Sequence, residues 1–239
     1  MQSREEILGK IRNAHQNAPK FEVPQVPVVR ATRGASTQEM LSTFEQELNA
    51  LSGRFFHARS LSEARNIVSS LIDDLGWCDF SAVEHPLLRE IFPPETLERF
   101  YFGEETAGGA LDEKTLREKT DKRRLSRLSA GVVFPRFLIA ETGTVALFNE
   151  STHERLNCYL PPACLAVGKT SQLREHLPAV WGEIAREARD ANARGEWLLV
   201  TGPSRTADIE KVTILGVHGP KVLCVLVIDD NSEDSSVAR

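Results

Sequence analysis

Seven consecutive apolar residues, VLCVLVI, occupy positions 222–228 near the end of the chain. The turn sequence GVHGP precedes them by one residue and two aspartates follow them. A short, unbroken apolar run of this kind is typical of a central strand in a parallel sheet, because such a strand is buried on both faces. The run therefore predicts the centre of a mostly parallel sheet that is covered by helices.

The segments upstream alternate between strand and helix patterns, which is typical of an α/β fold. Ser36 and Glu39 have the spacing of a capping box, as do Ser3 and Glu6, and apolar residues at helical spacing follow both pairs. The expected strands are 54–58, 78–83, 137–140, 145–148, 163–167 and 197–200, and the expected helices are 36–48, 62–75, 111–128 and 173–193.

Three parts of unequal length are expected along the chain. Residues 1–35 hold an N-terminal helix and a proline-containing extended arm, which can wrap its own domain or a partner subunit of a homo-oligomer. Residues 36–230 form a single α/β domain, since 239 residues can share one hydrophobic core. Residues 231–239 are polar and are expected to be a disordered tail.

Charge and composition exclude several classes of protein. The formal net charge of −5 argues against a nucleic-acid binder, and the basic run 119–127 is interpreted as a solvated helix face because no aromatic residues interleave with it. No segment is apolar enough for a secretory signal or a membrane span. The sequence therefore predicts a cytoplasmic protein with no membrane span and no nucleic-acid partner.

The four cysteines, Cys78, Cys158, Cys164 and Cys224, are widely spaced. Their spacing supports neither a zinc ribbon nor an iron–sulfur cluster, and we expect reduced, structural thiols. The chain also lacks GxGxxG, a Walker loop, HExxH and a nucleophile elbow. No metal and no bound cofactor is expected.

The loop GPSRTADIE follows the expected strand 197–200, and a helix is expected to begin around Ala207. Backbone N–H groups at a helix N-terminus, two hydroxyls and the guanidinium of Arg205 would together form an anion site. The alternative is a well-capped helix with no ligand. The candidate anion-binding residues of this loop are Gly202, Ser204, Arg205, Thr206 and Asp208.

The loop ETGT, residues 141–144, interrupts two apolar segments. If the first is a strand of the parallel sheet, Glu141 lies at a carboxyl edge, where such sheets bind ligands. Glu141 could then be a general base or a nucleophile, and Thr142, Gly143 and Thr144 would contact the substrate. The alternative is a hairpin turn in which Gly143 supplies the backbone angle.

The loop GVHGP, residues 216–220, places His218 between flexible and rigid positions just before the apolar run. A histidine held in this way suits proton transfer, with Gly219 beside the substrate, although a lone histidine is more often structural. His153 and Glu154 are weaker candidates and are expected to be surface polar residues.

Three segments, IAETGTVAL, YLPPACLAVGK and TGPSRTADIEKVTILGVHGPKVLCVLVIDD, resemble the lactate-utilisation protein C family, the single-domain members of the LUD family. The resemblance extends from about Phe44 to Asp229. It implies a fold similar to the sugar-phosphate isomerase and CoA-transferase-like proteins. By position, the family motifs fall on the residues of the three loops. Where the family has small residues and a threonine, this chain has Val133-Phe134-Pro135-Arg136, which changes the shape of the local pocket.

The resemblance implies a role in oxidising L-lactate to pyruvate beside iron–sulfur partner proteins that carry the clusters. The first hypothesis is accordingly a non-cluster component that binds a small organic acid or other anion. The second is a free-standing enzyme of the CoA-transferase or isomerase type with Glu141 as nucleophile or base. The third is a ligand-sensing or interaction module.

Overall fold

A computed structural model describes residues 4–16, 34–102, 122–187, 189, 195–207, 213–216 and 219–230. The chain divides into two compact units, Met1–Ala31 and Thr32–Arg239. The first unit contains α1 (Arg4–Gln16), as the sequence predicts. Residues 17–33 of the expected arm and the whole expected tail, 231–239, lie outside the described residues.

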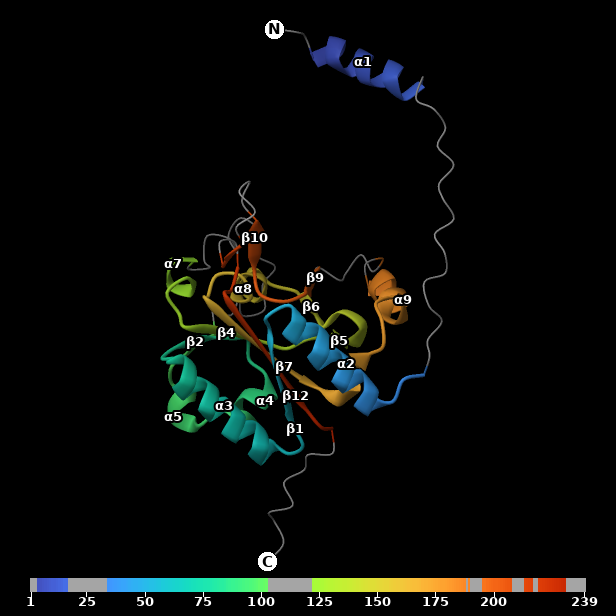
Figure 1. Ribbon diagram of the computed structural model, residues 1–239. Coiled ribbons are helices and arrows are strands. Elements are labelled where there is room, and N and C mark those ends of the chain that lie inside the picture. Colours follow the sequence, from blue (N-terminus) through green and yellow to red (C-terminus); the bar gives the residue numbers. More distant parts are fainter. Residues whose placement is uncertain are drawn as a thin grey trace, which may run out of the picture. The chain divides into compact units, whose positions relative to one another are not determined.

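The second unit is built on a six-stranded sheet whose strands are all parallel (Figure 1). The apolar run forms β12 (Val222–Ile228) inside this sheet, which confirms the predicted α/β class with a mostly parallel sheet. The strand order is β1 (Arg54–Ala58), β12, β7 (Ala163–Lys169), β4 (Ala130–Val133), β2 (Phe80–Ser81) and β3 (Phe100–Tyr101).

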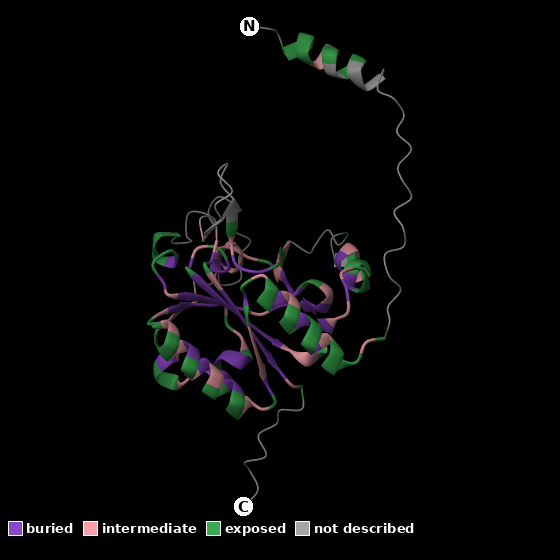
Figure 2. Ribbon diagram, in the orientation of Figure 1, coloured by how far each residue is buried: buried purple, intermediate pink, exposed green. Residues whose placement is uncertain are grey.

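Alternate residues of β12 belong to two separate cores. Cys224, Leu226 and Ile228 pack with α3 (Leu61–Leu75) and α4 (Pro86–Ile91) on one face. Leu223, Val225 and Val227 pack on the other face with α2 (Thr37–Ala50) and a second sheet. All six side chains are buried, and Figure 2 shows the strands buried between helices with exposed outer faces. Burial on both faces explains why the run contains no polar residue.

The second sheet has four strands in the order β8 (Leu173–Arg174), β5 (Phe137–Ile139), β6 (Thr144–Asn149) and β9 (Glu196–Val200). β6 is antiparallel to both β5 and β9. The face of this second sheet that points away from α2 packs on α9 (Pro178–Glu187), which contributes Val180 and Ile184. The expected helix 173–193 is therefore wrong at its start. Residues 170–172 form a 3₁₀ turn, β8 pairs with β5, and Pro178 occupies the first helical turn.

The remaining elements are short. α5 (Pro94–Leu97), α7 (Lys122–Leu125) and α8 (Thr152–Asn157) lie beside the sheets, and β10 (Arg205–Ala207) and β11 (Thr213–Leu215) form an antiparallel pair. The predicted strand 78–83 is β2, which is shorter than expected. The predicted helix 111–128 lies largely outside the described residues, and only α7 falls within it. Every described helix falls short of what a bilayer crossing requires.

Two glycines allow the connections around the carboxyl ends of β4 and β7 to approach closely. A Cβ on Gly131 would lie 2.0 Å from the backbone oxygen of Asn157, so α8 packs directly against β4. The Nδ2 of Asn157 donates to the carbonyl of Val132 at 2.7 Å, which fastens this contact. A Cβ on Gly168 would lie 2.9 Å from Oε1 of Gln172.

We expect Gly131→Ala to lower the free energy of unfolding by about 1–3 kcal/mol, because the new methyl group overlaps main-chain atoms of α8. Urea unfolding followed by circular dichroism measures the change. Gly182→Ala in α9 is the matched control, since nothing lies within 4 Å of its Cβ position. It should raise stability by about 0.5–1 kcal/mol through helix propensity. Equal stability of wild type and Gly131→Ala would show that α8 does not pack as described.

Candidate functional site

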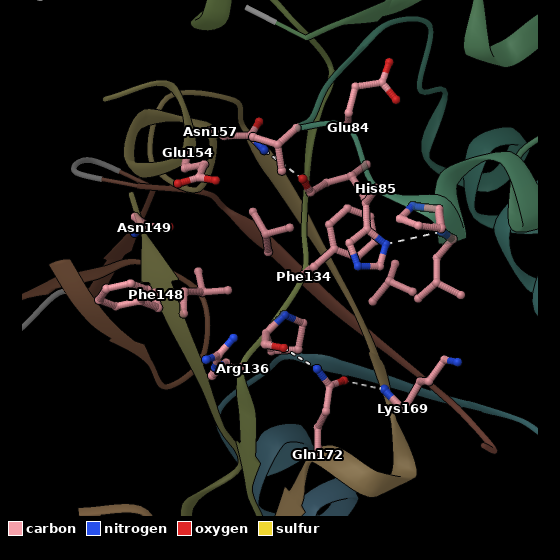
Figure 3. Close-up of a pocket in the computed structure, with 18 of the residues that line it drawn as sticks. Glu84, His85, Phe134, Arg136, Phe148, Asn149, Glu154, Asn157, Lys169 and Gln172 are labelled. Atoms are coloured by element: carbon pink, nitrogen blue, oxygen red, sulfur yellow. Dashed lines mark hydrogen bonds between the residues drawn. The ribbon is translucent and has the colours of Figure 1, made fainter. Parts of the chain in front are cut away.

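A pocket with a volume of about 630 Å³ lies at the carboxyl ends of β2, β4 and β7 (Figure 3). This is the edge of a parallel sheet at which α/β proteins bind ligands. Residues from β6 and α8 close its other side. The lining residues used below are Glu84, His85, Phe134, Arg136, Leu147, Phe148, Glu150, Glu154, Lys169 and Gln172.

Gln172 connects the end of β7 to the segment that follows β4. Its Oε1 accepts a hydrogen bond from the backbone N–H of Lys169 at 2.6 Å, and its Nε2 donates to the carbonyl of Pro135. Because Gly168 has no side chain, the amide of Gln172 can lie against the strand. These bonds hold Lys169 and the segment 134–136 at the same pocket wall.

His85 is fixed in orientation by its position just before α4. Its Nδ1 accepts a hydrogen bond from the backbone N–H of Leu87 at 3.2 Å, as an N-cap, and Pro86 takes the first helical position. The imidazole stacks on Phe134 with ring centroids 3.7 Å apart and an interplanar angle of 11°. Since Nδ1 is the acceptor, the proton of the neutral ring is on Nε2, which is available as a donor.

Burial lowers the pKa of His85 from 6.5, and the nearby positive charge of Lys169 lowers it further. The neutral ring is thus favoured in the folded protein. The neutral ring of His85 therefore contributes to the stability of the folded state above pH 6.5, and this contribution is lost as the pH falls through the lowered pKa. At neutral pH His85 therefore acts as an uncharged hydrogen-bond donor.

Lys169 is half-buried and forms no ion pair with the residues that the structure describes. On the neighbouring strand, Asp230 follows β12 and accepts hydrogen bonds from Thr170 and Ser171. Partial burial opposes ionisation of Asp230, but these bonds and Lys169 outweigh it and lower its pKa. Lys169 thus acts on Asp230 at a distance but forms no close ion pair with it, and its ammonium can still pair with an anionic ligand.

Glu154 lies on the opposite wall and is oriented by the capping box of α8. Its Oε2 accepts hydrogen bonds from the backbone N–H groups of Ser151, at 2.9 Å, and Glu150. The Oγ of Ser151 accepts in return from the Glu154 N–H at 3.1 Å. The other carboxylate oxygen, Oε1, has no hydrogen bond to a described residue.

The expectation that His153 is a surface residue is wrong. It is 9% exposed, its Nε2 donates to the carbonyl of Ala82 at 3.0 Å, and its ring meets Tyr101 edge to face. Burial lowers its pKa. His153 therefore has a structural role, since it ties α8 to the segment that leads into His85.

The ETGT loop is a turn of the β5–β6 hairpin rather than the end of a strand in the parallel sheet. Gly143 has φ +59°, and a Cβ there would lie 2.6 Å from the backbone N of Leu48 in α2. Glu141 donates its backbone N–H to the carbonyl of Glu175. The predicted carboxyl-edge position of Glu141 is wrong, because β5 and β6 form a separate antiparallel pair.

The helix expected at Ala207 is also absent from the described structure, because residues 205–207 form β10 and pair antiparallel with β11. Arg205 instead donates to the carbonyl of Leu51 and lies 3.3 Å from the Oγ of Ser52, at the C-terminal end of α2. Positive side chains stabilise helix C-termini by such contacts. Residues 205–207 therefore do not supply the helix N-terminus on which the predicted anion site depended.

The three predicted loops do come together, at the amino ends of β1, β7 and β12. The hydroxyl of Thr144 lies 2.7 Å from those of Thr142 and Thr201, which links ETGT to GPSR. Gly202 packs on Leu51, and Gly219 packs on Ser204. Asp208, His218 and the side chain of Thr206 lie outside the described residues. Of the loop residues that the structure describes, none lines the pocket at the carboxyl edge.

The residues that sequence reasoning missed are His85, Phe134, Lys169 and Gln172. Pro86 in Glu84-His85-Pro86 was an available signal, because proline favours the first position of a helix and the residue before it is then the N-cap. The departure from the family pattern at residues 133–136 was a second signal. Lys169 and Gln172 had no local signal, since their role depends on the contact between β7 and β4.

Comparisons with known proteins agree on one family. The model of the LUD domain matches residues 41–228. Lactate utilization protein C of Shouchella clausii is 24% identical over 93% of this chain and 90% of that protein, and its counterpart in Geobacillus thermodenitrificans is 23% identical over 96% and 98%. The counterpart in Bacillus licheniformis is 31% identical over 45% of each chain.

A solved structure, that of a DUF162 family protein from Deinococcus radiodurans, is similar in fold. The TM-score is 0.55 at 17% identity, over 81% of this chain and 99% of that one. At this identity the likeness establishes the fold alone.

We expect NMR titration to give His85 a pKa below 6.5, because burial and Lys169 both disfavour the imidazolium. Lys169→Met should raise this pKa part of the way towards 6.5, since burial remains. Lys122→Met, at an exposed lysine outside the pocket, is the control and should leave it unchanged. A pKa of 6.5 or more in the wild type would contradict the described environment of His85.

Proposed function

The chain belongs to the LUD domain family, and from this premise we propose that it is the non-cluster component of a system that oxidises L-lactate to pyruvate. Relatives that align over nine-tenths of the chain are lactate utilization proteins C. In this proposal the chain works in the cytoplasm and binds a small organic acid, and iron–sulfur partner proteins accept the two electrons that lactate releases.

The observation that carries the proposal is the pocket at the carboxyl edge. Lys169 offers a charge with no ion-pair partner among the described residues, and His85 offers a neutral donor fixed in orientation. A carboxylate pairs with the ammonium, and an oxygen of the bound acid accepts from Nε2–H. Both groups are provided by the scaffold before any ligand arrives.

The cysteine environments support the assignment of the clusters to partner proteins. Burial raises the pKa of Cys158 to about 12 and that of Cys224 to about 11, and it raises the pKa of Cys164 well above 9. Thiols bind iron as thiolates, so protonated, buried thiols are poor ligands. Only Cys78 is exposed.

The free-standing enzyme with Glu141 as nucleophile is less favoured. Glu141 lies in a hairpin turn against α2, and it does not line the pocket. The ligand-sensing module and an anion site at the three loops both stay as predictions, and the second can be tested together with the pocket.

The first experiment measures thermal unfolding against L-lactate and pyruvate in wild type, Lys169→Met, Arg205→Ala and Lys122→Met. A ligand at a hundred times its Kd should raise Tm by roughly 5–10 °C in the wild type. Lys169→Met should lose most of this shift because the carboxylate loses its ion pair, and Lys122→Met should retain it.

The Arg205→Ala variant separates the two candidate sites. Retention of the ligand shift in this variant places the acid in the pocket. Loss of the shift in Arg205→Ala with retention in Lys169→Met would place the site at the loops instead and would refute the pocket assignment.

The purified chain alone should not reduce an artificial electron acceptor with L-lactate, since its proposed role needs partner proteins. A coupled dye assay tests this, with a whole-cell extract of a lactate-grown bacterium as the positive control. Lactate oxidation by the isolated chain would overturn the assignment as a non-cluster component, and loss of that activity in Glu141→Gln would favour the free-standing enzyme.

A further inference from the structure

The pocket is much larger than a three-carbon acid requires. Its volume of about 630 Å³ falls within the range of roughly 300–1,000 Å³ that is typical of sites for drug-sized ligands. A water molecule takes up about 30 Å³ in the liquid, so a molecule with the six heavy atoms of lactate fills only a small part of the space. The pocket can therefore hold a ligand considerably larger than lactate.

The charges around the pocket are separated into two ends. Arg136 and Lys169 lie with Gln172 on one side of Phe134, whereas Glu154 and Glu84 lie on the other side (Figure 3). Glu150 lies next to Glu154, since its backbone N–H donates to that carboxylate. A ligand that is complementary to this arrangement has an anionic group at one end and a hydrogen-bond donor at the other.

Apolar side chains line the pocket as well as the charged ones. Phe134 is half-buried and is held by its stacking on His85, and Leu147 and Phe148 from β6 also line the pocket. Aromatic side chains of fixed orientation bind flat rings by stacking. The middle of the ligand is therefore expected to be a ring system.

We propose that the pocket binds an anion that carries a flat heteroaromatic ring with an exocyclic amine, and a purine nucleotide is the test case. The phosphate lies at Arg136 and Lys169, the base lies along Phe134, and the amine donates to Glu154. The proposal rests on the proposed function in placing ligand binding in this pocket, but it assigns a ligand beyond the organic acid.

Glu154 is the acceptor best prepared for such an amine. Its Oε2 is occupied by two backbone N–H groups, which fix the carboxylate, and Oε1 remains for a ligand. Glu84 is exposed and lies 3.8 Å from Arg89 in a loose ion pair, so it is expected to contribute less to binding the amine. A fixed acceptor costs no ordering entropy on binding, which favours Glu154.

The experiment compares AMP, IMP and ribose 5-phosphate by isothermal titration calorimetry with the full chain. AMP should bind most tightly. IMP lacks the amine and should bind about tenfold more weakly, because a hydrogen bond to a charged acceptor is lost. Ribose 5-phosphate lacks the base and should bind at least tenfold more weakly than AMP. Coenzyme A and NAD test whether the nucleotide is part of a larger molecule.

Glu154→Gln should remove most of the preference for AMP over IMP, since glutamine preserves the capping box and removes the charge. Glu39→Gln in α2 is the matched control. Glu39 has the same capping-box position beside Ser36, lies outside the pocket, and should leave both affinities unchanged. Phe134→Leu should weaken AMP and IMP alike.

Equal affinities for AMP and IMP, or for AMP and ribose 5-phosphate, would overturn the proposal. Absence of AMP binding would do so as well. If lactate or pyruvate still gave the shift that depends on Lys169, the proposed function would stand while this inference fell. Binding of AMP without any response to lactate or pyruvate would support the inference and count against the small acid.

Discussion

The second unit depends on the burial of β12 on both of its faces. Cys224, Leu226 and Ile228 face α3 and α4, and Leu223, Val225 and Val227 face α2 and the second sheet. Both packing layers are attached to this one strand, so its neighbours β1 and β7 are held in parallel register on either side. Their carboxyl ends are thereby brought to one edge, and the pocket extends from there over β4 and β2.

The pocket wall is formed where layers meet closely rather than by a single loop. Gly131 and Gly168 remove side chains at two points, which lets Asn157 and Gln172 reach the strands. The second sheet then closes the space opposite the parallel sheet. A pocket made in this way contains residues from β4, β6, β7, α4 and α8, and its shape depends on packing over most of the unit.

Sequence reasoning predicted the fold better than the site, and particular elements explain why. The capping box at Ser36, the apolar spacing in 62–75 and the run 222–228 follow local rules of capping, periodicity and burial, so α2, α3 and β12 could be predicted. The two strands within residues 137–148 were predicted, but the strands with which they pair could not be inferred, because pairing depends on the tertiary fold. The same limitation applies to Arg205–Ala207, whose strand pairing replaced an expected helix.

The site was predicted at the glycine-containing loops because a short motif carries its information in a few adjacent residues. In this chain the glycines of these loops are required by packing, because Gly143 and Gly202 have positive φ where the chain passes close to α2. The pocket residues are dispersed instead, and His85, Phe134 and Lys169 lie at or just beyond the ends of three different strands. A site of this type leaves no local motif. It becomes visible only when topology identifies which strand ends share an edge, and the chemistry of each side chain can then be considered together with its neighbours.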